Sequence, residues 1–218
     1  MREVHKRRKS NVSNIRQLIL NHIYENIKSY IIIVLIFIIG IIIGIVFINN
    51  VDEAQGSEIQ SYITDFISAL KQDYHIDKGE LLKKSLWENF WLILSMWFIG
   101  STVVGIPIVF GIVLFRGFCI GYTVSSIIAA LGVQKGMLFL FTTVFLQNII
   151  FIPVIICMAV SCIKLYKSIM KDKRRENIKI EILRHTLISI ILLIFLVIAS
   201  LVEAYISTNL LMLSINLL

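Results

Sequence analysis

The sequence is poor in charge compared with an ordinary soluble domain. Only 16% of its 218 residues are Asp, Glu, Lys or Arg, whereas 57% are hydrophobic. Soluble domains are about 25% charged and about 45–50% apolar. The composition therefore excludes an ordinary soluble globular domain and predicts an integral membrane protein.

Residues and motifs that carry catalytic or metal chemistry are also scarce. The three cysteines (Cys119, Cys157 and Cys162) lie in or beside apolar runs and do not have the spacing of metal ligands. The sequence contains no HExxH motif, no GxSxG motif and no phosphate-binding loop. We therefore expect a protein that is not an enzyme and that has no metal, cofactor or catalytic residue.

Long apolar runs are what the sequence has in abundance. A membrane-spanning helix needs about 20 apolar residues, and five runs meet or approach this length. They predict an all-α polytopic membrane protein with five transmembrane helices, at 30–48, 86–106, 117–131, 137–163 and 185–205. The second to fourth spans thus occupy 86–163, and Trp87 and Trp91 mark the outer interface of the second. The apolar residues 105–116 are too few to cross alone, so they either continue a helix or re-enter the membrane.

Positive charge is sorted to one side of these spans. Residues 1–29 hold seven of the 21 Lys and Arg, and residues 164–184 hold eight, whereas 49–85 carries seven acids. Because basic segments stay in the cytoplasm, we predict a basic amphipathic N-terminal segment over 1–29 and a basic loop over 164–184 on that side. Residues 49–85 and the tail 206–218 are then extracytoplasmic. The net charge of +7 comes from Lys and Arg beside the spans, which we expect to orient the protein in the membrane and to contact anionic lipid. We therefore expect no nucleic-acid partner.

The extracytoplasmic segment 49–85 is predicted to be helical and amphipathic. Ser57 and Gln60 have the spacing of a capping box, and Asp77 with Glu80 predicts a second helix start. Apolar residues at helical spacing form one stripe, which consists of Ile59, Tyr62, Ile63, Phe66, Ile67 and Leu70. Because so short a segment cannot form its own core, the stripe must pack on the membrane, on the spans or on another protein. We predict that its exposed side binds a partner.

Small residues four apart occur in two of the predicted spans. Gly40 and Gly44 lie in the first span, and Gly117 and Gly121 lie in the third. Such spacing lets helix backbones approach closely in lipid. The pattern favours packing between helices of this chain, and a homodimer through the first span is the alternative.

Polar side chains inside apolar runs need partners. Gln147 and Asn148 lie near the middle of the fourth predicted span, shortly before Pro153, whose ring frees a backbone carbonyl. They are interpreted as residues that hold helices together, and the lining of a polar pathway is the alternative. Arg116 is predicted at the cytoplasmic interface and Glu203 near the outer end of the last span, so the two should be unable to pair.

Several of these features together resemble the stage II sporulation protein M family. The residues that carry the resemblance are the stretch 88–100 (ENFWLILSMWFIG), Gly105-Ile-Pro107, Arg116-Gly117, Gly121, and the polar residues Asn89, Asn148 and Glu203. The resemblance covers almost the whole chain. Arg116 stands where many members of that family carry Asn.

The resemblance implies a component of the engulfment machinery of endospore formation, placed in the mother-cell septal membrane. Members of the family recruit two peptidoglycan-degrading proteins, the stage II sporulation D and P proteins, and act as a scaffold. The alternative is a transport or lipid-handling protein. Segment 105–116, Pro153 and the Gln147–Asn148 pair favour it, because discontinuous helices often border substrate sites.

Overall fold

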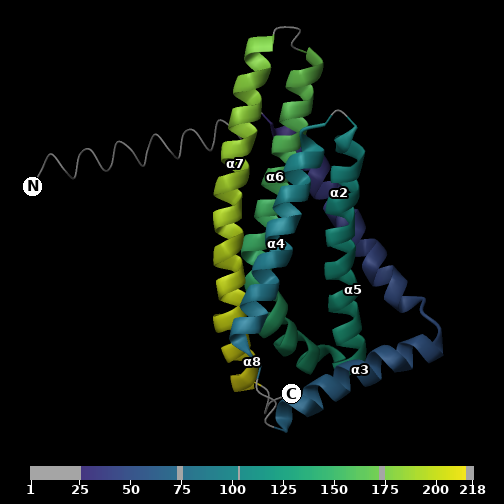
Figure 1. Cartoon of the computed structure of the whole chain (residues 1–218). Coiled ribbons are helices and arrows are strands. Elements are labelled where there is room, and N and C mark those ends of the chain that lie inside the picture. The colour runs from purple at the N-terminus through teal and green to yellow at the C-terminus, as the bar shows by residue number, and fades with distance from the viewer. Residues whose placement is uncertain (1–25, 73–75, 103, 172–174, 215–218) are drawn as a thin grey trace, which may run out of the picture.

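The computed structural model describes residues 26–72, 76–102, 104–171 and 175–214, and these residues form helices and short connections without a strand. Five long helices lie side by side (Figure 1). They are α2 (Ile27–Asn49), α4 (Lys78–Gly100), α5 (Gly105–Leu140), α6 (Leu146–Lys171) and α7 (Arg175–Leu201). The predicted all-α class is confirmed. The predicted N-terminal amphipathic segment falls almost wholly outside the described residues.

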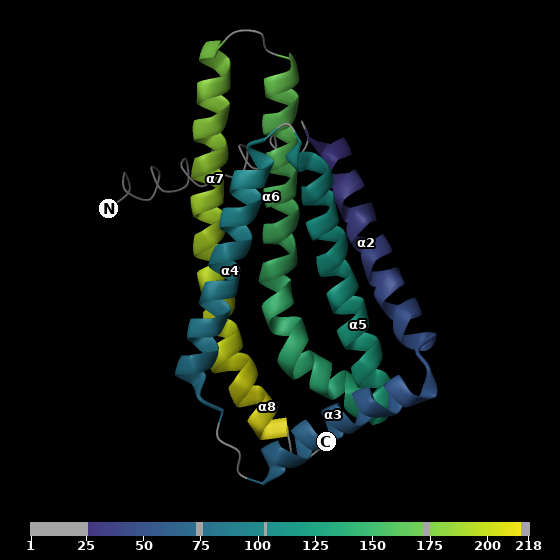
Figure 2. The same ribbon diagram turned by 45° about the vertical axis from the view of Figure 1, so that its right-hand side comes forward.

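Shorter helices close one end of the bundle. Helix α3 (Glu53–Lys71) lies across the lower ends of the long helices in Figures 1 and 2, close to α8 (Thr208–Ser214). The π-helical turns η1 (Phe141–Phe145) and η2 (Val202–Ser207) lead into α6 and α8.

The connection from α4 to α5 resolves the uncertainty over residues 105–116. Helix α4 ends at Gly100, a turn and a half before the predicted end at 106, and α5 begins at Gly105. Pro107 lies in the first turn of α5. A backbone N–H at this position would have no acceptor within the helix, so the proline costs no hydrogen bond. Residues 105–116 are therefore the first turns of one long helix and not a separate re-entrant piece.

The chain reverses direction between α5 and α6. Gly132 has φ 76° and ψ 170°, a left-handed conformation that glycine adopts at little cost. Residues after Gly132 run along the lower end of the bundle before η1 and α6 lead back up, as Figure 2 shows. This reversal gives α5 and α6 opposite directions.

Side chains from all five long helices form the main core. Among the largest fully buried residues are Ile33, Met96, Val109, Val113, Ile155, Met158 and Leu196. A second, smaller core joins Ile67 and Leu70 of α3 to Ile127 and Phe139 of the α5 region and Leu211 of α8. Helix α3 is thus fixed to the end of the bundle by apolar burial.

Three segments are long and apolar enough to cross a membrane. They are Ile27–Asn49, Gly105–Met170 and Ile178–Leu213. The second has 66 residues and contains the reversal at Gly132, so it comprises the two antiparallel helices α5 and α6. Helix α4 is not among the three, since Lys83, Lys84 and Glu88 lie in its first half. The count of five spans stays a prediction.

The basic segment 164–184 is mostly helical and not a loop. It extends α6 to Lys171 and begins α7 at Arg175, and these ends project beyond the other helices in Figure 2. Lys167 Nζ donates to Ser29 Oγ at 3.0 Å, which joins this end to the start of α2. The start of α2 and the basic segment therefore lie at the same end of the bundle, and α3 lies at the opposite end.

One of the two predicted helix starts in the outer segment is wrong. Helix α3 begins at Glu53, before Ser57, whose hydroxyl donates to the carbonyl oxygen of Ala54 at 2.7 Å. Ser57 is thus already inside the helix and cannot cap it. The other start is correct, because Asp77 accepts from the backbone N–H groups of Gly79 and Glu80 at 2.8 and 3.2 Å.

Candidate functional site

The stripe of α3 has an inner and an outer side. Ile67 and Leu70 are buried in the smaller core, and Ile59 and Ile63 are half-buried. Tyr62 and Phe66 remain 76% and 42% exposed. The same helix thus uses part of its apolar face for attachment and presents the rest outward.

A groove separates the exposed part of α3 from the bundle. Its volume is about 550 Å³. It is lined by Glu58, Ile59, Tyr62, Ile63 and Phe66 of α3, by Tyr122, Thr123, Ser126 and Ile127 of α5, and by Phe139. The exposed aromatic residues therefore border a recess and do not lie on a flat surface.

The two glycine pairs face each other across the contact between α2 and α5. A Cβ at Gly40 would overlap the carbonyl oxygen of Leu114, and one at Gly44 would overlap that of Phe118. Reciprocally, a Cβ at Gly117 or Gly121 would overlap carbonyl oxygens of α2. The face of α2 that carries Gly40 and Gly44 is thus occupied within the chain, and a homodimer would use another face.

A polar cavity lies between α4, α5 and the start of α6. Its volume is about 310 Å³. It is lined by Ser85, Glu88, Asn89, Arg116, Cys119, Ile120, Thr123, Thr143, Val144, Gln147, Asn148, Phe151 and Glu203. Thr123 also lines the groove under α3, so the two recesses adjoin.

Glu203 is the centre of the hydrogen bonds in this cavity. Its Oε2 accepts from Ser85 Oγ at 2.5 Å and from Gln147 Nε2 at 2.6 Å. Ser85 Oγ also lies 3.0 Å from Ser200 Oγ, to which Asn89 Nδ2 donates at 2.8 Å. One carboxylate and one pair of serines therefore connect α4, α6 and the end of α7.

Asn148 and Pro153 contribute differently. Asn148 lines the cavity and its amide donates to the carbonyl oxygen of Val144 at 2.7 Å, within its own helical segment. Pro153 lies inside α6 on an exposed face and does not line the cavity. The structure thus brings Gln147, Asn148 and Glu203 together, with Pro153 outside the group.

The predicted separation of Arg116 from Glu203 is wrong. Both residues line the same cavity, because α5 begins at Gly105 and so places Arg116 about three turns inside the bundle. The guanidinium carbon lies 5.1 Å from the centroid of the Phe151 ring. Within the described residues no salt bridge joins Arg116 to Glu203 or to any other carboxylate.

Sequence reasoning missed Ser85, Glu88 and Ser200 as members of this site. Ser85 and Ser200 are small hydroxyl residues in apolar helices, where serine often donates only to its own backbone. The one available signal was their position near Asn89 and Glu203 in the chain. Which faces of α4 and α7 meet depends on the tertiary arrangement.

The described part of the chain contains no group of three or more His, Cys, Asp or Glu side chains able to hold a metal ion. Cys162 is buried, and Cys119 and Cys157 are half-buried, all as free thiols.

Three apolar segments of spanning length, packed around a polar cavity, indicate a helical membrane protein. The family model of stage II sporulation protein M matches residues 33–208. The chain belongs to this sporulation family, and the predicted family is confirmed. Neither the comparison with curated proteins nor that with solved structures gives a match.

Proposed function

We propose that this protein is a non-enzymatic membrane scaffold of the sporulation engulfment complex. In this proposal the end of the bundle that carries α3 faces the extracytoplasmic side and binds peptidoglycan-degrading partners, the stage II sporulation D and P proteins, at the septal membrane. The acidic character of residues 49–85 and the basic character of the opposite end support this orientation.

The observation that carries the proposal is the exposure of two aromatic side chains on a firmly attached helix. Tyr62 and Phe66 border a groove of about 550 Å³, while Ile67 and Leu70 fix α3 to the bundle. Aromatic residues are enriched among the side chains that dominate binding energy at protein interfaces. An exposed aromatic pair beside a recess, on a helix attached by its buried residues, suits the binding of a partner segment.

The test replaces Tyr62 and Phe66 by Lys in the full chain. We expect recovery of the partner proteins in a pull-down from sporulating cells to fall about tenfold or more, as on loss of an interface hot spot. The matched control is Gln60→Lys, at an exposed position of the same helix, and membrane levels of all variants should be equal. Undiminished recovery with the double variant would refute the proposal.

The polar cavity favours a second candidate, a transport protein. Asn148, Gln147 and Glu203 line it together, as residues of a polar pathway would. If the protein moves small ions, liposomes containing it should release entrapped ions, and Asn148→Leu should abolish the release whereas Gln134→Leu, at an exposed position, should not. No release from a well-folded preparation would eliminate this candidate.

A further inference from the structure

Among the described residues, Arg116 is a cation without a carboxylate partner inside an apolar segment. It lies in the spanning-length segment Gly105–Met170 and is half-buried. The Phe151 ring is the contact that the structure gives its guanidinium, and no salt bridge reaches it from the described residues. An arginine is always protonated, and an unpaired charge at membrane depth is costly. A ligand that brings an anionic group into the cavity would relieve this cost.

The same cavity is also lined by two carboxylates, those of Glu203 and Glu88. Glu203 uses one carboxylate oxygen, Oε2, to accept from Ser85 and Gln147. Glu88 lines the cavity but is exposed, so it stands at the mouth. The cavity therefore presents one cation and two carboxylates, and a ligand that carries both signs of charge fits it better than a simple anion.

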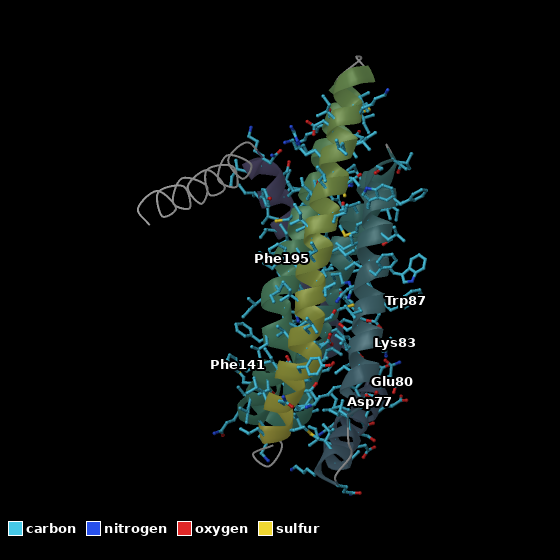
Figure 3. All side chains as sticks on the ribbon, turned by 60° about the vertical axis from the view of Figure 1, so that its left-hand side comes forward. Asp77, Glu80, Lys83, Trp87, Phe141 and Phe195 are labelled. Carbon is cyan, nitrogen blue, oxygen red and sulfur yellow. The ribbon has the colours of Figure 1, made fainter. Side chains whose placement is uncertain are left out.

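The mouth lies beside a cluster of aromatic side chains on α4. Trp87 and Trp91 have ring centroids 5.6 Å apart and Phe90 and Trp91 6.2 Å apart. All three are exposed, and Trp87 points away from the helices in Figure 3. These exposed rings offer an apolar surface beside the mouth, on which lipid acyl chains can pack. Glu88, which follows Trp87, lies next to this surface.

We propose that this cavity binds the zwitterionic headgroup of a phospholipid, a phosphate linked to an ammonium group. The phosphate would pair with the Arg116 guanidinium, whose planar donors suit phosphate oxygens. The ammonium group would lie between Glu88 and Glu203. A volume of about 310 Å³ is at the small end of ligand pockets, so it accepts a headgroup while the acyl chains stay outside, along the apolar surface of α4 near Trp87. The site is independent of the scaffold proposal, because it involves no residue of α3.

The experiment measures lipid binding to the purified full chain by native mass spectrometry during titration with phosphatidylethanolamine or phosphatidylglycerol. We expect the first phosphatidylethanolamine to bind about tenfold or more tightly than phosphatidylglycerol, which lacks the ammonium group. Arg116→Gln and Glu88→Gln should each weaken phosphatidylethanolamine binding about tenfold, the effect of one charge-assisted hydrogen bond. The matched controls Arg184→Gln and Glu80→Gln, outside the cavity, should bind as the unchanged protein does.

Two further measurements make the outcome decisive. If Arg116→Gln does not fold, Arg116→Lys keeps the charge but loses the planar donors, and it should still weaken binding severalfold. Soluble phosphoethanolamine should compete only weakly, because it lacks acyl chains. Equal binding of both lipids, undiminished binding by the cavity variants, or soluble phosphoethanolamine bound as tightly as the lipid would each overturn the proposal.

Discussion

At the scale of residues, helices α2 and α5 approach each other closely where side chains are absent. Gly40 and Gly44 of α2 meet Gly117 and Gly121 of α5, and each glycine lies where a Cβ would overlap a carbonyl oxygen of the other helix. In lipid, where burial of apolar surface gives no advantage to helix association, this close backbone contact supplies the packing energy. The α2–α5 pair is therefore sensitive to a single added methyl group.

The change Gly121→Ala tests this sensitivity. We expect it to destabilise the protein by about 1–3 kcal/mol, as overpacking of a filled contact does. The matched control is Gly111→Ala on the same helix, where an added Cβ has nothing within 4 Å. The control should be neutral or stabilising by up to about 1 kcal/mol, because alanine favours the helix. Unfolding by SDS in mixed micelles gives both values, and equal stability of the two variants would contradict the α2–α5 contact.

At the scale of elements, the apolar runs predicted which helices exist but not where they end. Helix α7 begins at Arg175, ten residues before the predicted span at 185, and α6 continues to Lys171. Lys, Arg and Glu are good helix formers, so a run of charge ends a membrane span without ending a helix. The polar start of α4 has a clearer signal, because Asp77 caps it through two backbone N–H groups.

The contribution of that cap can be measured with Asp77→Ala. We expect a loss of about 0.5–2 kcal/mol, the usual effect of removing an N-cap side chain, and faster amide hydrogen exchange over residues 78–82. Asp52→Ala is the matched control, because Asp52 precedes α3 without making a side-chain capping bond. If Asp52→Ala were as costly as Asp77→Ala, the capping interpretation would fail.

At the scale of the whole molecule, charge separates the two ends of the bundle. The end with α3 carries Asp52, Glu53, Glu58, Asp65, Asp77 and Glu80 together with Lys71, Lys78, Lys83 and Lys84, whereas the other end carries mainly basic residues, among them Lys28, Lys164, Lys167, Lys179 and Arg184. The antiparallel course of the helices brings these sequence-distant basic residues to one end (Figure 2). Such an asymmetry supports a single orientation in the membrane.

Thiol labelling tests the orientation. In a variant whose Cys119, Cys157 and Cys162 are replaced by Ala, a single cysteine is introduced at Gln60 or at Lys179, both exposed positions. A membrane-impermeant maleimide added to intact cells should label the first variant and not the second, because only α3 should face outward. Labelling of the Lys179→Cys variant alone would show that the topology is the opposite of the proposed one.

The sequence by itself determined the membrane class, the helical fold and the sorting of charge, because these depend on the length of local apolar runs and on the charges between them. The resemblance over almost the whole chain indicated the family, and the spacing of small residues indicated the four packing glycines. The tertiary structure alone decided that the two glycine pairs meet each other, that α3 lies across the end of the bundle, and that Arg116 shares a cavity with Glu203. Those facts depend on where each helix begins and which way it is rotated. Both follow from contacts between residues far apart in the chain, such as Ser85 and Glu203.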